Sequence, residues 1–149
     1  VDMASAAGGG DFRVMSYEDI VAGALNARVD AAICNFSLIG KESVDGLLHA
    51  APSLLNPAGA LIVQTLHPHL ACGDAPYVDG WREGSWSGFS DNFTDAPPWY
   101  FRTLETWARL FNESGLRLVE MREPVHPVTG KPVSVIFIGE LASSVCSTS

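Results

Sequence analysis

Apolar residues recur along this chain in two patterns, one typical of buried strands and one of amphipathic helices. In residues 30–36 the positions after the leading aspartate are apolar except for Asn35, which is typical of a strand buried on both faces of a parallel sheet. Apolar side chains then recur at helical spacing from Val44 to Leu55, although Pro52 lies inside that stripe. Residues 60–66 form a second buried strand after a turn at 56–59. This order predicts a βαβ unit with a right-handed crossover.

A strand followed by a helix is predicted before this unit. Residues 12–15 form a short apolar run, and apolar positions at helical spacing follow from Tyr17 onward. Ser16 is placed to cap that helix, and Asp19 occupies the second position of a capping box.

The end of the chain predicts a helix and a pair of strands. Thr103 is a suitable cap for a helix that Gly115 ends. Residues 116–122 and 133–140 are expected to form two closing strands, paired antiparallel. The polar tail at 143–149 is expected to fray.

Residues 67–102 show no periodicity and are rich in Gly, Pro, Asp and aromatic residues; we call this stretch the aromatic segment. A loop of this length in a compact domain is usually functional or contains short elements of its own. We expect it to cover a substrate pocket, to form a satellite hydrophobic cluster, or both. The candidate substrate-binding residues of this segment are Trp81, Trp86, Trp99 and Tyr100.

Composition restricts the class of protein. A chain of 149 residues corresponds to one domain, and nine Lys and Arg against 17 Asp and Glu give a net charge of −8. This charge argues against nucleic-acid binding, and the apolar runs are too interrupted for a membrane span. Three widely spaced cysteines and no signal-peptide pattern favour a reducing cytoplasm. No zinc pattern fits His67, His69, Cys72 and Asp74, so no metal site is expected.

Three stretches carry a resemblance to a known family. They are the strand and loop at 30–40, the Leu-Leu-Asn-Pro-Ala-Gly turn at 54–59 running into the strand at 60–63, and the passage from Tyr100 through Glu123-Pro124. In this order they resemble the later two-thirds of a class I S-adenosylmethionine-dependent methyltransferase, with Ala58 where that family usually has glycine. The resemblance implies a Rossmann-like α/β fold of three layers, its sheet mostly parallel with an antiparallel C-terminal hairpin.

One departure from the family pattern is large. The family's first strand and its GxGxG loop are absent, and Gly8-Gly9-Gly10 precedes a predicted strand where the family loop would follow one. Residues 1–142 are therefore expected to be a partial methyltransferase domain, with Val1-Asp2 at the end of the family's second strand. The missing strands would leave one edge of the sheet exposed, and homo-oligomers could form through that edge. This chain alone is also expected to bind S-adenosylmethionine poorly.

The resemblance also implies roles for individual residues. Asp2 would bind the cofactor ribose, and the other candidate cofactor-binding residues are Ser16, Tyr17, Asn35, Phe36, Ser37 and Leu38. For each of them a purely local role, as a helix cap, a core aromatic or a loop residue, is the alternative. His67 is placed to act as a general base or an orienting group. Arg102 would either orient the start of a helix or bind an acidic substrate.

The implied function is methyl transfer from S-adenosylmethionine to a small-molecule acceptor. Two alternatives remain at this point. The chain could be a non-catalytic scaffold or binding remnant of the same fold, or a nicotinamide-dependent Rossmann enzyme, which the closing antiparallel pair argues against.

Overall fold

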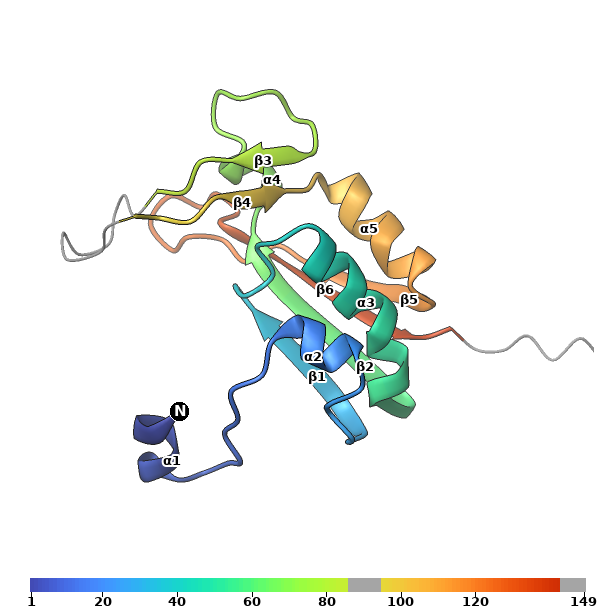
Figure 1. The fold of residues 1–149 in the computed structure, drawn as a ribbon. Coiled ribbons are helices and arrows are strands. Elements are labelled where there is room, and N and C mark those ends of the chain that lie inside the picture. The colour runs from blue at the N-terminus through green and yellow to red at the C-terminus, as the bar shows by residue number, and fades with distance from the viewer. Residues whose placement is uncertain (86–94, 143–149) are drawn as a thin grey trace, which may run out of the picture.

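The computed structural model describes residues 1–85 and 95–142, which form a twisted sheet with helices on one face (Figure 1). The main sheet has the strand order β1, β2, β6, β5, with bounds Val29–Asn35, Leu55–Leu66, Ser134–Leu141 and Leu116–Arg122. β1 pairs parallel with β2, whereas β6 is antiparallel to both β2 and β5. The Rossmann-like α/β fold with an antiparallel C-terminal hairpin is thereby confirmed. Where a mostly parallel sheet in three layers was expected, the described main sheet is mixed, with one parallel and two antiparallel pairings, and its described helices lie on one face.

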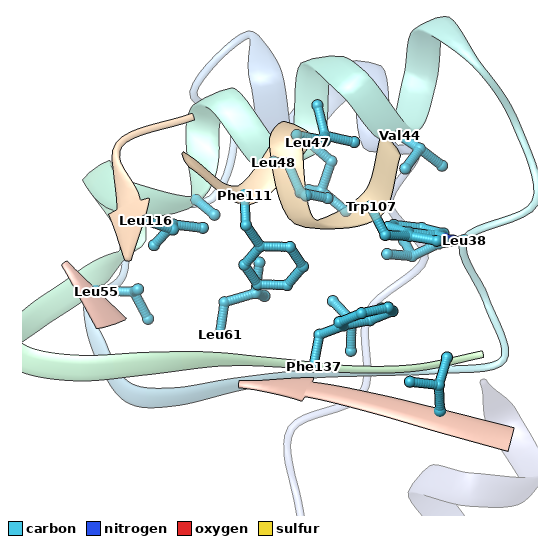
Figure 2. Close-up of a cluster of buried hydrophobic side chains, with 14 residues drawn as sticks. Leu38, Val44, Leu47, Leu48, Leu55, Leu61, Trp107, Phe111, Leu116 and Phe137 are labelled. Carbon is cyan, nitrogen blue, oxygen red and sulfur yellow. The ribbon is translucent and has the colours of Figure 1, made fainter. Parts of the chain in front are cut away.

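Three helices cover one face of this sheet. They are α2 (Tyr17–Val21), α3 (Glu42–Leu54) and α5 (Leu104–Glu113). The predicted stripe of α3 is buried against the sheet despite Pro52, which lies in its last turn. Figure 2 shows the side chains of α3 and α5 meeting those of β2 and β6 in a single cluster. Burial of these apolar groups supplies most of the favourable free energy of folding.

Close packing in this cluster depends on Gly139 in β6. A Cβ atom at that position would lie 2.5 and 2.7 Å from two ring carbons of Phe111. Phe111 and Phe137 are both fully buried, and their ring centroids are 5.9 Å apart. The glycine therefore allows α5 to approach the sheet closely.

The predicted helix caps are present. Ser16 and Asp19 form a reciprocal capping box at the start of α2, with hydrogen bonds of 3.0 and 3.1 Å. The Thr103 hydroxyl accepts a hydrogen bond from the Thr106 amide, and Gly115 follows α5 with a φ of 79°. The turn expected at 56–59 lies within β2, where Ala58 adopts a φ of 63°. This left-handed conformation is the physical reason that glycine suits the position of Ala58.

Two expectations for the beginning of the chain are wrong. Residues 12–15 form no strand, and Val1-Asp2 does not end one, because Asp2 begins the exposed helix α1 (Asp2–Ala7). Figure 1 shows α1 apart from the sheet. A strand persists only where a neighbour completes its hydrogen bonds, and among the described residues no strand lies beside the outer edge of β1.

The outer edge of the sheet is exposed at β1. Ile33, in the middle of this strand, keeps 69% of its surface exposed. β1 pairs with β2 on one side only within the described chain, so its other row of backbone groups is available for pairing. None of the described helices has the length and apolar character needed to cross a bilayer.

The aromatic segment contains short elements. α4 (Pro68–Ala71) follows β2 directly, and β3 (Gly80–Arg82) pairs antiparallel with β4 (Trp99–Phe101). In Figure 1 these elements lie above the ends at which β1 and β2 finish. The expected tail at 143–149 and the candidate Trp86 are outside the described residues.

Candidate functional site

A cavity of about 470 Å³ lies at the carboxyl ends of β1 and β2. Open α/β sheets bind ligands at such ends. The walls come from the loop after β1, the end of β2, α4, the aromatic segment and α5. Among the lining residues are Phe36, Leu38, Leu66, Trp99, Tyr100 and Trp107.

The loop after β1 is fixed by backbone contacts. Phe36 adopts a φ of 51°, and its amide donates to the Gln64 carbonyl of β2 at 2.9 Å. Leu38 is buried in the core, while the Ile39 carbonyl accepts a hydrogen bond from the Tyr100 amide at 2.7 Å. The aromatic segment is thus attached directly to the loop that forms the opposite wall.

The start of α2 meets the same loop. The Tyr17 hydroxyl donates to the Ser37 carbonyl at 3.0 Å, which joins residues that are 20 positions apart in the sequence. The structure therefore brings together Ser16, Tyr17 and the 35–38 loop, as the resemblance implied. Asn35, Phe36 and Ser37 keep exposed side chains there. Asp2 is not brought to this place, because it lies in α1 (Figure 1).

Arg102 is a buried link between the walls, with only 2% of its surface exposed. Its guanidinium donates to the Gly40 carbonyl at 2.9 Å, the Lys41 carbonyl at 3.0 Å and Asp45 Oδ1 at 2.7 Å. Partial burial raises the pKa of Asp45, but hydrogen bonds from Arg102 and Lys41 outweigh it, so the net pKa is lowered. Of the two roles expected for Arg102, the structure supports positioning.

The aromatic segment is also joined to the amino end of α5. The Thr103 amide donates to Asp79 Oδ1 at 2.9 Å, and the Leu104 amide donates to the Tyr77 hydroxyl at 3.0 Å. These bonds satisfy amides that a helix leaves unpaired at its first turn, and the carboxylate complements the helix dipole. The segment is therefore held at both the loop and the helix.

His67 differs from the sequence expectation. It is 2% exposed and does not line the cavity. Its Nδ1 accepts from the His69 amide at 3.2 Å, and its Nε2 lies 2.8 Å from Glu123 Oε1. Because Nδ1 is an acceptor, the ring proton lies on Nε2 and is donated to the carboxylate. Neither nitrogen is free to accept a substrate proton, so the geometry argues against a general base and favours a structural role.

The described aromatic candidates for substrate binding divide into two groups. Trp99 and Tyr100 line the cavity. Trp81 is 55% exposed and meets the Tyr100 ring edge-on at 5.5 Å, outside the lining. Trp107 also lines the cavity, although it was not among the residues predicted from the sequence. Its position four residues after Thr103, at the amino end of a helix that faces the aromatic segment, was the available signal.

Nucleophile and metal chemistry find little support here. Burial raises the pKa of the Cys34 thiol, which makes it a poor nucleophile. Across residues 1–85 and 95–142, no three His, Cys, Asp or Glu side chains are grouped as metal ligands would be.

Comparisons with solved structures identify the arrangement. The glycopeptide N-methyltransferase MtfA in complex with S-adenosyl-L-homocysteine superposes with a TM-score of 0.60 at 13% identity, over 83% of this chain and 59% of that one. The chain has a methyltransferase fold. No family model and no curated protein matches the sequence.

Two further methyltransferases share the fold. The 1,6-didemethyltoxoflavin-N1-methyltransferase of Burkholderia thailandensis gives a TM-score of 0.57 at 14% identity, covering 78% of this chain and 45% of that one. An S-adenosylmethionine-dependent methyltransferase of Mesorhizobium loti gives 0.51 at 18% identity, covering 74% and 61%. This chain therefore spans about three fifths or less of the length of these methyltransferases.

Proposed function

We propose that this chain supplies the acceptor cavity and one wall of the cofactor site for methyl transfer from S-adenosylmethionine to a small molecule. The observation that carries the proposal is the cavity at the carboxyl ends of β1 and β2, bounded by the Phe36 to Ile39 loop. Four of the residues that the family resemblance assigns to the cofactor, Asn35 to Leu38, lie on or beside this loop, and Tyr17 is hydrogen-bonded to it, whereas Asp2 lies elsewhere in α1.

The loop offers groups that fit a nucleoside and an amino acid. Phe36 is about half exposed and can pack against a planar base, while the exposed Asn35 and Ser37 can pair with polar groups. The Ser37 carbonyl already accepts from Tyr17, and a carbonyl oxygen has a second lone pair for another donor.

The chain's contribution to catalysis is alignment in an apolar space. S-adenosylmethionine would be held along the loop from Asn35 to Leu38 and would supply an electrophilic methyl group with a sulfur leaving group. Leu38, Leu66 and Trp99 give the acceptor cavity apolar walls, and the Tyr100 to Ile39 hydrogen bond joins two of these walls. Orientation of this kind accounts for several kcal/mol of a displacement barrier, roughly 7–11 at best.

The exposed edge of β1 limits cofactor affinity in this proposal. A ligand at a sheet crevice is normally held between the ends of two strands, whereas β1 has one described neighbour. We therefore expect this chain to bind the cofactor weakly by itself. We also propose that residues 1–142 act as one partial domain in a reducing cytoplasm and that copies associate through the β1 edge.

Nuclear magnetic resonance of the ¹⁵N-labelled chain tests the proposal, because it detects weak binding and locates it. Millimolar S-adenosylhomocysteine is expected to shift the amides of residues 16–17 and 35–38, and equal concentrations of NADH are expected to leave them in place. A Ser37→Pro variant removes the Ser37 amide reporter and distorts the loop, while Ser53→Ala in α3 is the control. Absence of localised shifts would favour the scaffold alternative, and equal shifts with NADH would favour a nicotinamide enzyme. Micromolar binding of S-adenosylhomocysteine, measured by calorimetry, would contradict only the expectation of weak affinity and not the proposed function.

A further inference from the structure

Among the described residues, no side chain that lines the acceptor cavity is able to remove a proton near neutral pH. Its described lining residues include no Asp, Glu, His, Lys or Cys. Arg102 is the one cation in that lining, and a guanidinium does not lose its proton in proteins. Tyr100 contributes a phenol, whose hydroxyl can donate a hydrogen bond to a ligand. His67 is near in sequence to the cavity, but both of its ring nitrogens are occupied.

This chemistry restricts the accepting atom. An aliphatic amine is protonated at neutral pH and an aliphatic alcohol is a weak nucleophile, so both need a base to react. A heteroaromatic nitrogen, an arylamine or an acidic phenol carries an available lone pair without one. Any proton that such an acceptor releases after transfer passes to water.

The shape and surface of the cavity favour a planar molecule. Of the residues that the structure describes, five aromatic side chains contribute to its lining: Phe36, Trp99, Tyr100, Phe101 and Trp107. Aromatic faces and edges bind planar rings through stacked or edge-on contacts, which adds to the benefit of burying apolar surface. A volume of about 470 Å³ is within the range of cavities that hold small organic ligands.

The charged side chains next to Tyr100 disfavour a cationic ligand. The Arg102 guanidinium lies 4.9 Å from the Tyr100 ring centroid, and the Lys41 ammonium lies 5.7 Å from it. Asp45 pairs with both of these cations, so the three groups together carry one net positive charge. A permanently cationic ligand next to Tyr100 would be repelled, whereas an uncharged or anionic one would not.

From these observations we propose that the cavity takes a planar aromatic acceptor, uncharged or acidic, whose accepting atom is nucleophilic without a protein base. The assignment of this ligand as a methyl acceptor rests on the proposed function, whereas its binding does not.

Fluorescence of N-phenyl-1-naphthylamine, an uncharged planar probe that brightens in apolar sites, tests the proposal on the full chain. One probe is expected to bind per chain and to be displaced by quinoline, but not by glucose or n-butylamine. Trp99→Ala is expected to weaken probe binding about tenfold, because it removes an aromatic wall. Ala71→Phe, which fills the cavity from α4 without removing a wall, is expected to weaken it as well.

Phe12→Ala is the matched control, because it removes an exposed aromatic ring outside the cavity and is expected to leave probe affinity unchanged. Circular dichroism establishes that each variant is folded. The proposal is overturned if the probe binds equally to both cavity variants, or if glucose or n-butylamine displaces it as well as quinoline does. If the chain does not bind the probe but S-adenosylhomocysteine still shifts the loop amides, only this proposal is refuted. If the probe binds as expected but S-adenosylhomocysteine causes no localised shifts, only the proposed function is refuted.

Discussion

Replacement of Arg102 by methionine tests whether this residue joins the cavity walls. The substitution keeps a long apolar stem but removes three hydrogen bonds, to the carbonyls of Gly40 and Lys41 and to Asp45. Removing one partner of a buried ion pair costs about 3–5 kcal/mol. The Asp45 side chain keeps 33% of its surface exposed, so water can partly replace the lost partner and the lower end, about 3 kcal/mol, applies.

Urea unfolding followed by circular dichroism measures this loss. Arg109→Met, in the helix α5 that follows Arg102, is the matched control, because Arg109 is exposed and its two ion pairs are 3.8 and 4.0 Å long. We expect that control to lose less than about 0.5 kcal/mol. Equal effects of the two substitutions would refute the structural role of Arg102. If Arg102→Met is too unstable to measure, Arg102→Lys, which keeps the charge but not the planar fork, should give an intermediate loss.

The pH dependence of the same measurement identifies Asp45 as the partner. Because the folded pKa of Asp45 is lowered, its ionisation stabilises the fold at pH values above the unfolded pKa of about 3.9. That contribution is lost as the pH falls through the lower folded pKa. The stability difference between wild type and Arg102→Met should therefore shrink below about pH 4. A difference that stays constant to the lowest pH at which the chain folds would argue against this pairing.

Three further substitutions, one of them with a matched control, test the backbone conformation at Ala58, the packing at Gly139 and the exposed edge of β1. Ala58→Gly should stabilise the fold by about 0.5–1 kcal/mol in urea unfolding, since it relieves a positive φ, while Ala60→Gly at an ordinary strand position should destabilise it. Gly139→Ala should cost about 1–3 kcal/mol in the same assay because its methyl would overlap the Phe111 ring. Ile33→Lys should shift sedimentation toward monomer at high concentration, and an unchanged distribution would exclude association through β1.

Elements with local signals could be predicted from the sequence. The capping box at Ser16, the apolar stripe of α3 and the end of α5 at Gly115 each depend on residues within a few positions of one another. The position of the cavity was also predictable, because parallel neighbours such as β1 and β2 must finish at the same edge of a sheet.

Features that depend on distant partners were not predictable. Residues 12–15 have the composition of a strand, but a strand also needs a neighbour, which their own sequence cannot reveal. The burial of Arg102 depends on carbonyls about 60 positions away. The role of His67 changed because Glu123, 56 positions later, lies against its Nε2. In each case the sequence pointed to the right residues, but their structure or role depends on partners that are distant in the sequence.

The attachment of the aromatic segment has a consequence for how such a protein can diversify. Its contact with Ile39 uses only backbone atoms, and the side chains that hold α5, Tyr77 and Asp79, lie outside the cavity wall. Residues that face the cavity, such as Trp99, can therefore be substituted one at a time or together while the hydrogen bonds of Tyr77, Asp79 and the Tyr100 amide are kept. Apart from Arg102, which both lines the cavity and stabilises the fold, ligand preference and stability are encoded by different residues of this segment, so a change in the first need not reduce the second.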